Sequence, residues 1–172
     1  LEPRNTTGRS GFDGSMARRL RLAAGLIALA ISLSGCGSGA LWDKFTEAGF
    51  HGIGIAEDYD GQGGDVVMQM LLARELARSL GGLAWIWGIT SFAGSKSIGL
   101  YGSAEQKAKY LPLIATGQLK AAIAFTEPGG GTDLLGAMAT TADRVDGGWK
   151  LNGEKIWSSS AHVADYLLVI AR

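Results

Sequence analysis

Two short segments of the sequence combine residue types that suit the binding of a flat aromatic ligand carrying a diphosphate. Residues 125–133 read Phe-Thr-Glu-Pro-Gly-Gly-Gly-Thr-Asp, and the consecutive glycines can enter conformations closed to other residues, leaving backbone N–H groups to face phosphate oxygens. Further along, Trp157 supplies a flat ring and residues 158–160 supply serine hydroxyls, which can pack on a ring and hydrogen-bond its edge. The two segments together predict a dinucleotide with an aromatic head group.

The same residues also have purely structural interpretations. A glycine-rich run commonly does no more than reverse the chain, and Trp157 and Ser159 can be an edge aromatic and a loop hydroxyl. We expect Glu127 to cap the turn before Pro128 rather than to act as a catalytic base. Asp133 can accept a hydrogen bond from a ligand or cap the following turn, and the sequence leaves both open.

Helices are expected before these segments. Apolar residues at helical spacing predict helices over residues 40–48, 66–80, 84–101 and 104–115. Asp65 is a good N-cap for the second, and the third is apolar on most sides, as in a helix buried between others. Ser103 and Gln106 have capping-box spacing at the start of the fourth, where Pro112 is a point of possible breakage.

From residue 120 the pattern changes to strands. Residues 121–125 and 140–145 read as short strands, and residues 146–148 form a turn that leads into a return strand beginning at Trp149. Residues 166–170 are apolar on both faces, which predicts a strand in the interior of a sheet. We expect residues 120–172 alone to be poorly stable, because an unfinished sheet leaves edges unpaired.

Composition narrows the class of protein. The 172 residues contain 16 basic and 16 acidic side chains and 47% hydrophobic residues, which predicts a neutral protein with a packed core and no nucleic-acid partner. The single cysteine, Cys36, excludes an internal disulfide, and with only His51 and His162 beside it there is no metal-ligand spacing. We therefore expect no metal.

The first 39 residues differ in character from the rest. Residues 16–36 comprise a basic stretch, an apolar stretch and small residues, which is signal-peptide architecture. Residues 33–36 (LSGC) are similar to a bacterial lipobox, with Cys36 as the lipidation site. Three interpretations stay open: genuine export, a fusion or reading-frame artefact, and a buried apolar helix.

Several motifs occur together in the remaining sequence. They are residues 57–64 (EDYDGQGG), 73–77 (ARELA), 101–107 (YGSAEQK), 126–129 (TEPG) and 152–155 (NGEK). In this order they resemble the acyl-CoA dehydrogenase family, from Leu41 to Arg172. The resemblance implies an α+β fold, in which a helical amino-terminal domain (40–119) precedes an incomplete antiparallel β-barrel or sandwich domain (120–172), after the leader 1–39.

The resemblance also implies an FAD cofactor and a role for individual residues. Residues 123–132 would line the flavin and its diphosphate, Trp157 would pack beside the isoalloxazine, and Ser159 would supply a hydroxyl near flavin N5. Thr132 would also contact the acyl-CoA. The implied cofactor residues are Ile123, Phe125, Thr126, Gly131, Thr132, Trp157, Ser158 and Ser159.

The activity implied by the resemblance is α,β-dehydrogenation of an acyl-CoA thioester, with hydride transfer to flavin N5. The base that takes the α-proton is expected beyond residue 172, so we expect no turnover from these residues alone. An electron-transfer acceptor, a homo-oligomeric parent and a cytoplasmic location are implied as well. The alternatives are a flavin oxidase or monooxygenase of the same fold, and a non-catalytic binding module anchored in a membrane through Cys36.

Overall fold

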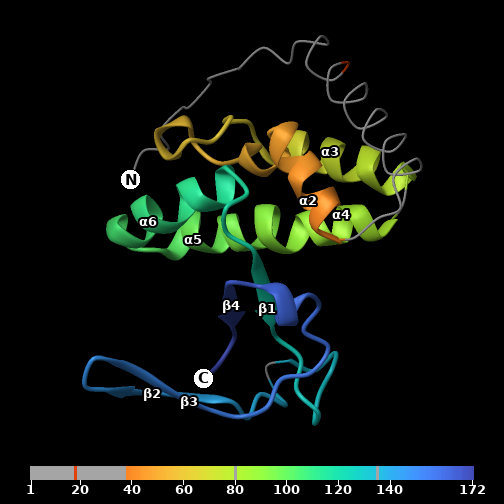
Figure 1. Cartoon of the computed structure of the whole chain (residues 1–172). Coiled ribbons are helices and arrows are strands. Elements are labelled where there is room, and N and C mark those ends of the chain that lie inside the picture. Colours follow the sequence, from red (N-terminus) through yellow and green to blue (C-terminus); the bar gives the residue numbers. More distant parts are fainter. Residues whose placement is uncertain (1–17, 19–37, 80, 135) are drawn as a thin grey trace, which may run out of the picture.

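The helices form one layer and the strands lie beneath it. The computed structural model describes residues 18, 38–79, 81–134 and 136–172. In Figure 1 the helices gather on one side of the molecule, and β1 runs out of this layer into the β region. The helices are α2 (Ser38–Glu47), α3 (Val66–Ser79), α4 (Gly81–Trp87), a π-helix (Gly88–Gly94), α5 (Ser95–Tyr101) and α6 (Ala104–Ala115).

The main core of the helical layer joins α2, α3 and α4 with the segment that holds Phe50 and Ile53. Trp87 is buried there and donates a hydrogen bond from Nε1 to the Phe50 carbonyl (3.0 Å). Asp65 accepts from the Met68 N–H (3.0 Å), which confirms the predicted N-cap of α3. The apolar residues of this core are Leu41, Phe45, Phe50, Ile53, Leu72, Leu76, Leu83 and Trp87.

The single helix predicted over residues 84–101 is three consecutive helical segments. The run begins earlier, at Gly81, and passes through the π-helix Gly88–Gly94 before α5. Serine side chains satisfy carbonyls in the irregular part, where Ser95 Oγ donates to the Ser91 carbonyl (2.7 Å) and Ser97 Oγ to the Ala93 carbonyl (2.8 Å). Apolar periodicity cannot reveal this widening, because the helical pattern continues through it.

Pro112 does not break α6. The helix runs from Ala104 to Ala115 with Pro112 inside it, and Gly117 follows with a left-handed φ of 71°. The predicted capping box is present, with the Gln106 N–H donating to Ser103 Oγ (3.2 Å) and the Ser103 N–H donating to Gln106 Oε1 (2.8 Å). Ala108, four residues before the proline, is exposed, so its carbonyl can be solvated instead of receiving an intrahelical bond.

The β region holds two pairs of strands. β2 (Thr141–Val145) and β3 (Gly148–Asn152) form the predicted antiparallel hairpin, whereas β1 (Ala121–Ala124) and β4 (Tyr166–Val169) pair in parallel. β4 is not an interior strand: Tyr166 is 47% exposed and Leu167 is 50% exposed. Among the described residues, β4 has only β1 as a strand neighbour, so its apolar side chains are only partly covered.

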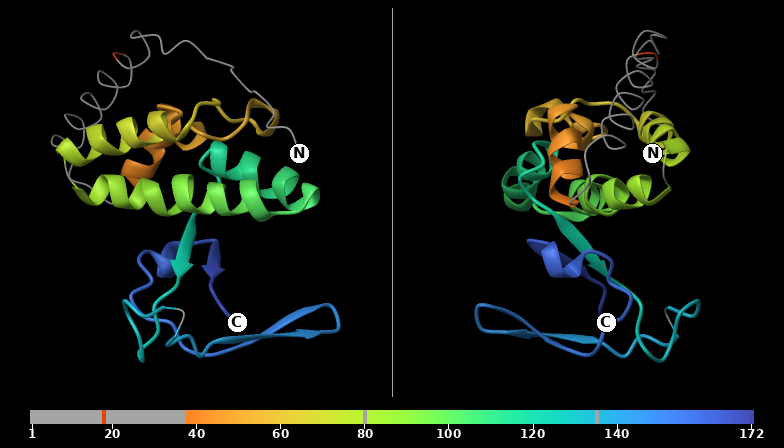
Figure 2. Two further views of the ribbon diagram at one scale, coloured as in Figure 1. Left: turned by 180° about the vertical axis from the view of Figure 1, so that it is seen from behind. Right: turned by 45° about the vertical axis from the view of Figure 1, so that its right-hand side comes forward.

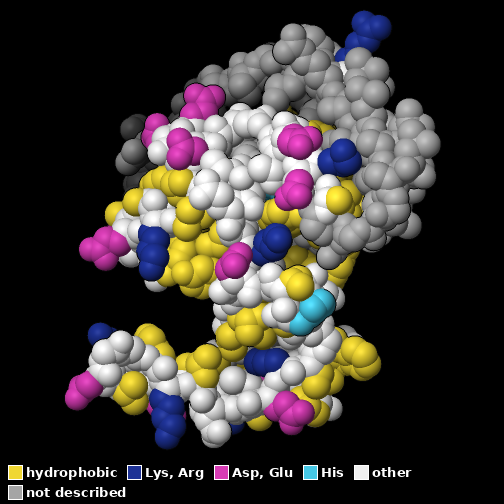
Figure 3. Space-filling view, viewed as in Figure 1, with side chains coloured by type: hydrophobic (Ala, Val, Ile, Leu, Met, Phe, Trp, Pro, Cys, Tyr) yellow, Lys and Arg dark blue, Asp and Glu magenta, His cyan; other side chains and the backbone are white. Residues whose placement is uncertain are grey.

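The hairpin projects from the rest of the molecule. Figure 2 shows it extending away from β1 and β4 in two further views. Figure 3 shows the surface hollowed between the hairpin and the helical layer, with hydrophobic side chains on the helical side. Of the leader 1–39, Arg18, Ser38 and Gly39 are described, and the last two begin α2. Apart from Arg18, the signal-like segment 16–36, with Cys36, lies outside the described residues. No helix within the described ranges is long and apolar enough to cross a membrane.

Candidate functional site

The two segments singled out in the sequence meet just beyond the end of β1. The Ile156 N–H donates a hydrogen bond to the Thr126 carbonyl (2.8 Å), and Lys155 Nζ donates to the Phe125 carbonyl (3.1 Å). Residues about thirty positions apart in sequence are thereby held as neighbours. Ile123 lies on β1 opposite Leu168 of β4, on the strand that leads into this junction.

Trp157 extends into solvent from this junction. Its side chain is 84% exposed, and its φ of 58° places a large side chain in the left-handed region. The Ser159 N–H donates to the Trp157 carbonyl (3.0 Å), and Ser160 has a φ of 64°. Ser158 is half-buried and Ser159 is exposed. The indole face is therefore accessible to a flat ligand.

Glu127 does not cap the turn with its side chain. The turn is closed by the backbone, where the Gly130 N–H donates to the Glu127 carbonyl (3.1 Å). The carboxylate instead pairs with Lys155 Nζ (2.8 Å) and accepts from the N–H groups of Ala139 (2.6 Å) and Thr140 (2.9 Å). The Lys155 ammonium and these donors lower the pKa of Glu127 to about 2. A carboxylate held in this way is a poor proton acceptor near neutral pH.

The glycine run differs from its sequence interpretation. None of Gly129, Gly130 and Gly131 has a left-handed φ, so conformational freedom does not explain them. A Cβ on Gly130 would clash with the Ala137 side chain, whereas a Cβ on Gly131 would meet nothing within 4 Å. Close packing therefore explains Gly130. Gly131 and the following Thr132 are both open toward solvent or a ligand.

The side chain of Asp133 caps the turn that follows it. Its Oδ1 accepts from the Gly136 N–H (3.0 Å), which is the second of the two interpretations that the sequence left open. This turn holds the loop that follows the glycine run. No group of three or more His, Cys, Asp or Glu side chains among the described residues is placed to hold a metal ion.

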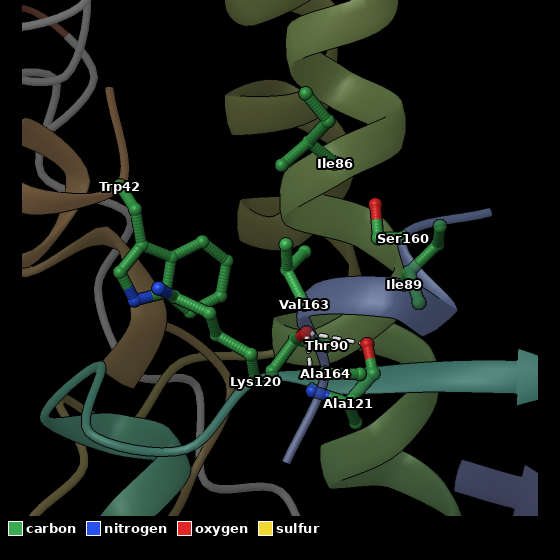
Figure 4. A pocket seen from close by; sticks show the side chains of 9 residues that line it. All are labelled: Trp42, Ile86, Ile89, Thr90, Lys120, Ala121, Ser160, Val163 and Ala164. Carbon is green, nitrogen blue, oxygen red and sulfur yellow. Dashed lines mark hydrogen bonds between the residues drawn. The ribbon is translucent and has the colours of Figure 1, made fainter. Parts of the chain in front are cut away.

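A small cavity lies between the helical layer and the β region. It has a volume of about 140 Å³ and is lined by Trp42, Ile86, Ile89, Thr90, Lys120, Ala121, Ser160, Val163 and Ala164. Figure 4 shows the Thr90 hydroxyl beside the Ala121 backbone and Lys120 beside Trp42, where Nζ lies 5.6 Å from the centroid of the indole ring. Ser160 also lines this cavity, so the loop that carries Trp157 faces the helical layer across it.

A larger groove lies along α5, α6 and β4. Its volume is about 580 Å³, and apolar residues such as Ile98, Leu119 and Leu167 dominate the lining. Tyr110 and Tyr166 meet edge to face within it, with ring centroids 5.2 Å apart. None of the predicted cofactor residues lines this groove. The sequence did not predict this groove, and the apolar character of β4 was its only signal there.

Comparison with known proteins agrees with the fold and with the order of the motifs. Residues 27–118 match the family description acyl-CoA dehydrogenase, N-terminal domain, and residues 122–172 match acyl-CoA dehydrogenase, middle domain. The first match begins inside residues 1–39, whose assignment as a separate leader stays a prediction.

Individual relatives support the same assignment. The 2-methylacyl-CoA dehydrogenase of Solanum tuberosum is 35% identical over 132 residues, which cover 77% of this chain and 32% of that protein. The structure of an acyl-CoA dehydrogenase complexed with FAD from Bacillus anthracis is 37% identical, with a TM-score of 0.76 over 90% of this chain and 28% of that one. The prolyl acyl carrier protein oxidase AnaB is 28% identical, with a TM-score of 0.80 over 91% of this chain and 44% of that one.

The matched sequence relative is much longer than this chain. The chain spans about a third of its length. Two consecutive domain matches cover most of the chain, and they agree with the α+β architecture described above. The chain belongs to the acyl-CoA dehydrogenase family.

Proposed function

We propose that residues 120–172 form the FAD-facing part of an enzyme that dehydrogenates an acyl-CoA thioester. The observation that carries this proposal is the hydrogen bond from Ile156 N–H to the Thr126 carbonyl (2.8 Å), which joins the two predicted cofactor segments into one surface. The bound FAD in the Bacillus anthracis relative supports the choice of cofactor.

The residues present fit a flavin dinucleotide. The exposed indole of Trp157 offers a face for the ring system, with the hydroxyls of Ser158 and Ser159 beside it. Ile123, Phe125 and Thr126 continue that surface along β1 and its exit. Around Gly131 the backbone is open to the approach of phosphate oxygens, and Thr132 adds an exposed hydroxyl for the cofactor or the acyl-CoA.

These contacts indicate which part of the reaction this chain would support and which part the cofactor would carry out. FAD, when bound, supplies the acceptor for the substrate β-hydride. This chain would orient the ring and provide hydrogen-bond donors at its edge. Glu127 is unsuitable as the α-proton acceptor because Lys155 and two backbone N–H groups hold its carboxylate. We propose that the base, the contacts with an electron acceptor and those with other subunits belong to parts of a longer enzyme, because the chain spans about a third of the Solanum tuberosum relative.

A titration of the purified chain with FAD tests the proposal. Binding is measured by equilibrium dialysis, so that loss of an indole quencher is not mistaken for loss of binding. We expect saturable binding that Trp157→Ala weakens at least tenfold. Trp149→Ala is the matched control, because Trp149 is also largely exposed (63%) but lies on the projecting hairpin. Equal affinity in both variants, or no binding by the unaltered chain, would contradict a self-formed flavin surface.

A flavin oxidase is the second candidate. The similarity to AnaB, with its TM-score of 0.80, favours it because that protein is a prolyl acyl carrier protein oxidase. The two candidates differ in what reoxidises the flavin. In a longer protein containing this chain, acyl-dependent oxygen consumption would favour the oxidase, and reduction of a dye acceptor without oxygen consumption would favour the dehydrogenase.

A further inference from the structure

The ion pair of Lys155 with Glu127 is unusually well buried for this chain. The two side chains are 10% and 8% exposed, whereas the arginines that pair with Glu75 are 56% and 73% exposed. Burying two charges is unfavourable unless good geometry and further hydrogen bonds compensate. Such compensating hydrogen bonds are therefore expected from the segments of the chain that the pair connects.

Each partner bridges several segments. Glu127 accepts from the Ala139 and Thr140 N–H groups, so its carboxylate ties the glycine-rich turn to the stretch before β2. Lys155 donates to the Phe125 carbonyl as well as to Glu127, and the next residue, Ile156, donates to the Thr126 carbonyl. Two consecutive residues after β3 thus hold two consecutive residues after β1.

The residue that follows this junction has a strained backbone. Trp157 has a left-handed φ of 58° and receives little packing in return, since 84% of its side chain is exposed. Such a conformation persists only where its surroundings hold it. Two backbone hydrogen bonds restrain it directly: the one immediately before it, from the Ile156 N–H, and the one from the Ser159 N–H to its own carbonyl.

We propose that Lys155 and Glu127 are positioning residues that lock the Trp157 loop onto the Phe125–Thr126 segment and so fix the indole for the flavin. This inference rests on the proposed function, because it assigns the pair a role in the same surface. It goes beyond a simple stabilising role in one respect: the pair also fixes the geometry of the loop, and a variant with restored stability would not recover that geometry.

Substitutions separate those two roles. Lys155→Met keeps an unbranched stem but leaves Glu127 buried without its cation, so it should lower both the melting temperature and the affinity for FAD. Glu127→Gln combined with Lys155→Met removes both charges and should recover most of the lost melting temperature. We expect its affinity for FAD to stay at least tenfold weaker than that of the unaltered chain. Lys150→Met, on the exposed strand β3, is the control and should change neither property.

Hydrogen exchange gives a measurement that does not depend on FAD. In the double variant we expect at least tenfold faster exchange of the Ile156 amide and unchanged exchange of amides in α6. Unchanged exchange at Ile156, or full affinity for FAD in the double variant, would overturn the positioning role. If the unaltered chain binds no FAD, the proposed flavin surface fails on its own, and exchange at Ile156 still decides whether the pair locks the loop.

Discussion

The hydroxyl of Thr90 makes two hydrogen bonds with the backbone of Ala121. It donates to the Ala121 carbonyl and accepts from the Ala121 N–H, each at 2.9 Å, and both residues are buried. Thr90 lies in the π-helix and Ala121 is the first residue of β1, so one side chain fastens the strand to the helical layer. The orientation of β1, and of the segment that follows it, depends on this contact.

Replacing Thr90 by valine should therefore destabilise the protein. Valine keeps the shape but leaves a buried N–H and a buried carbonyl without the hydroxyl, at a cost of roughly 1–3 kcal/mol in unfolding free energy. Thr90→Ser retains the hydroxyl and should lose distinctly less unfolding free energy than Thr90→Val. Chemical denaturation of the two variants measures the difference, and equal losses of stability would mean that the methyl group lost in Thr90→Ser matters as much as the hydrogen bonds lost in Thr90→Val.

His51 predicts a dependence of stability on mildly acidic pH. The ring is buried, its Nδ1 lies 2.7 Å from Ser91 Oγ, and burial lowers the pKa of His51 from 6.5 to about 4. Between these values the unfolded chain binds a proton that the folded chain does not, so stability rises with pH through this window. The contribution is complete above about pH 6.5, and the loss on going to pH 4 is about 3 kcal/mol. His51→Gln should flatten the curve of unfolding free energy between pH 6.5 and 4, whereas the same change at the exposed His162 should not.

The lowered pKa of Glu127 predicts a second loss of stability at more acidic pH. Its pKa is lowered from 4.5 to about 2, so the stabilisation is present above pH 4.5 and disappears as the pH falls toward 2. Glu127→Gln should remove this limb while leaving the His51 limb in place. The control is Glu154→Gln, at an exposed position one residue before Lys155. A limb of unchanged size in Glu127→Gln would refute the assignment to this carboxylate.

Adjacent glycines should respond in opposite ways to alanine. Gly130→Ala brings a methyl group against Ala137 and should cost roughly 1–3 kcal/mol of stability. Gly131→Ala meets nothing within 4 Å, so its stability should stay within about 0.5 kcal/mol of the unaltered chain. If FAD phosphates approach this backbone, Gly131→Ala should nevertheless weaken FAD binding at least tenfold. Denaturation and equilibrium dialysis on both variants provide the comparison.

The sequence predicted the elements well where the signal is local. The Asp65 cap of α3, the Ser103–Gln106 capping box and the turn at Gly147 each depend on a few neighbouring residues, and each is present. The motif order also identified the family correctly. In the two caps and the turn, a single short window of sequence contains all of the interacting groups, whereas the family was identified from several such windows in order.

What the sequence missed requires partners that are far apart. Apolar periodicity cannot predict the parallel pairing of β1 with β4 or the contact of Thr90 with Ala121. In both cases the sequence around one partner contains no information about the other. The role of Lys155 was missed for the same reason. Glu127 was interpreted by its neighbour Pro128, whereas its side chain binds a residue 28 positions away. Opposite charges near two glycine-rich turns were the only available signal.

The parallel arrangement of β1 and β4 has a consequence for the order of folding. Lys120 and Asp165, which flank these strands, are hydrogen-bonded although they are 45 positions apart, so the chain between them forms one long closed loop. Closing such a loop is slow compared with forming the β2–β3 hairpin inside it, because only a short turn connects these two strands. We infer that the hairpin forms early and the β1–β4 pair late. The junction of Thr126 with Ile156 also joins distant segments, so it would form after the hairpin. The proposed flavin-facing surface would then be complete only once these long-range contacts are in place.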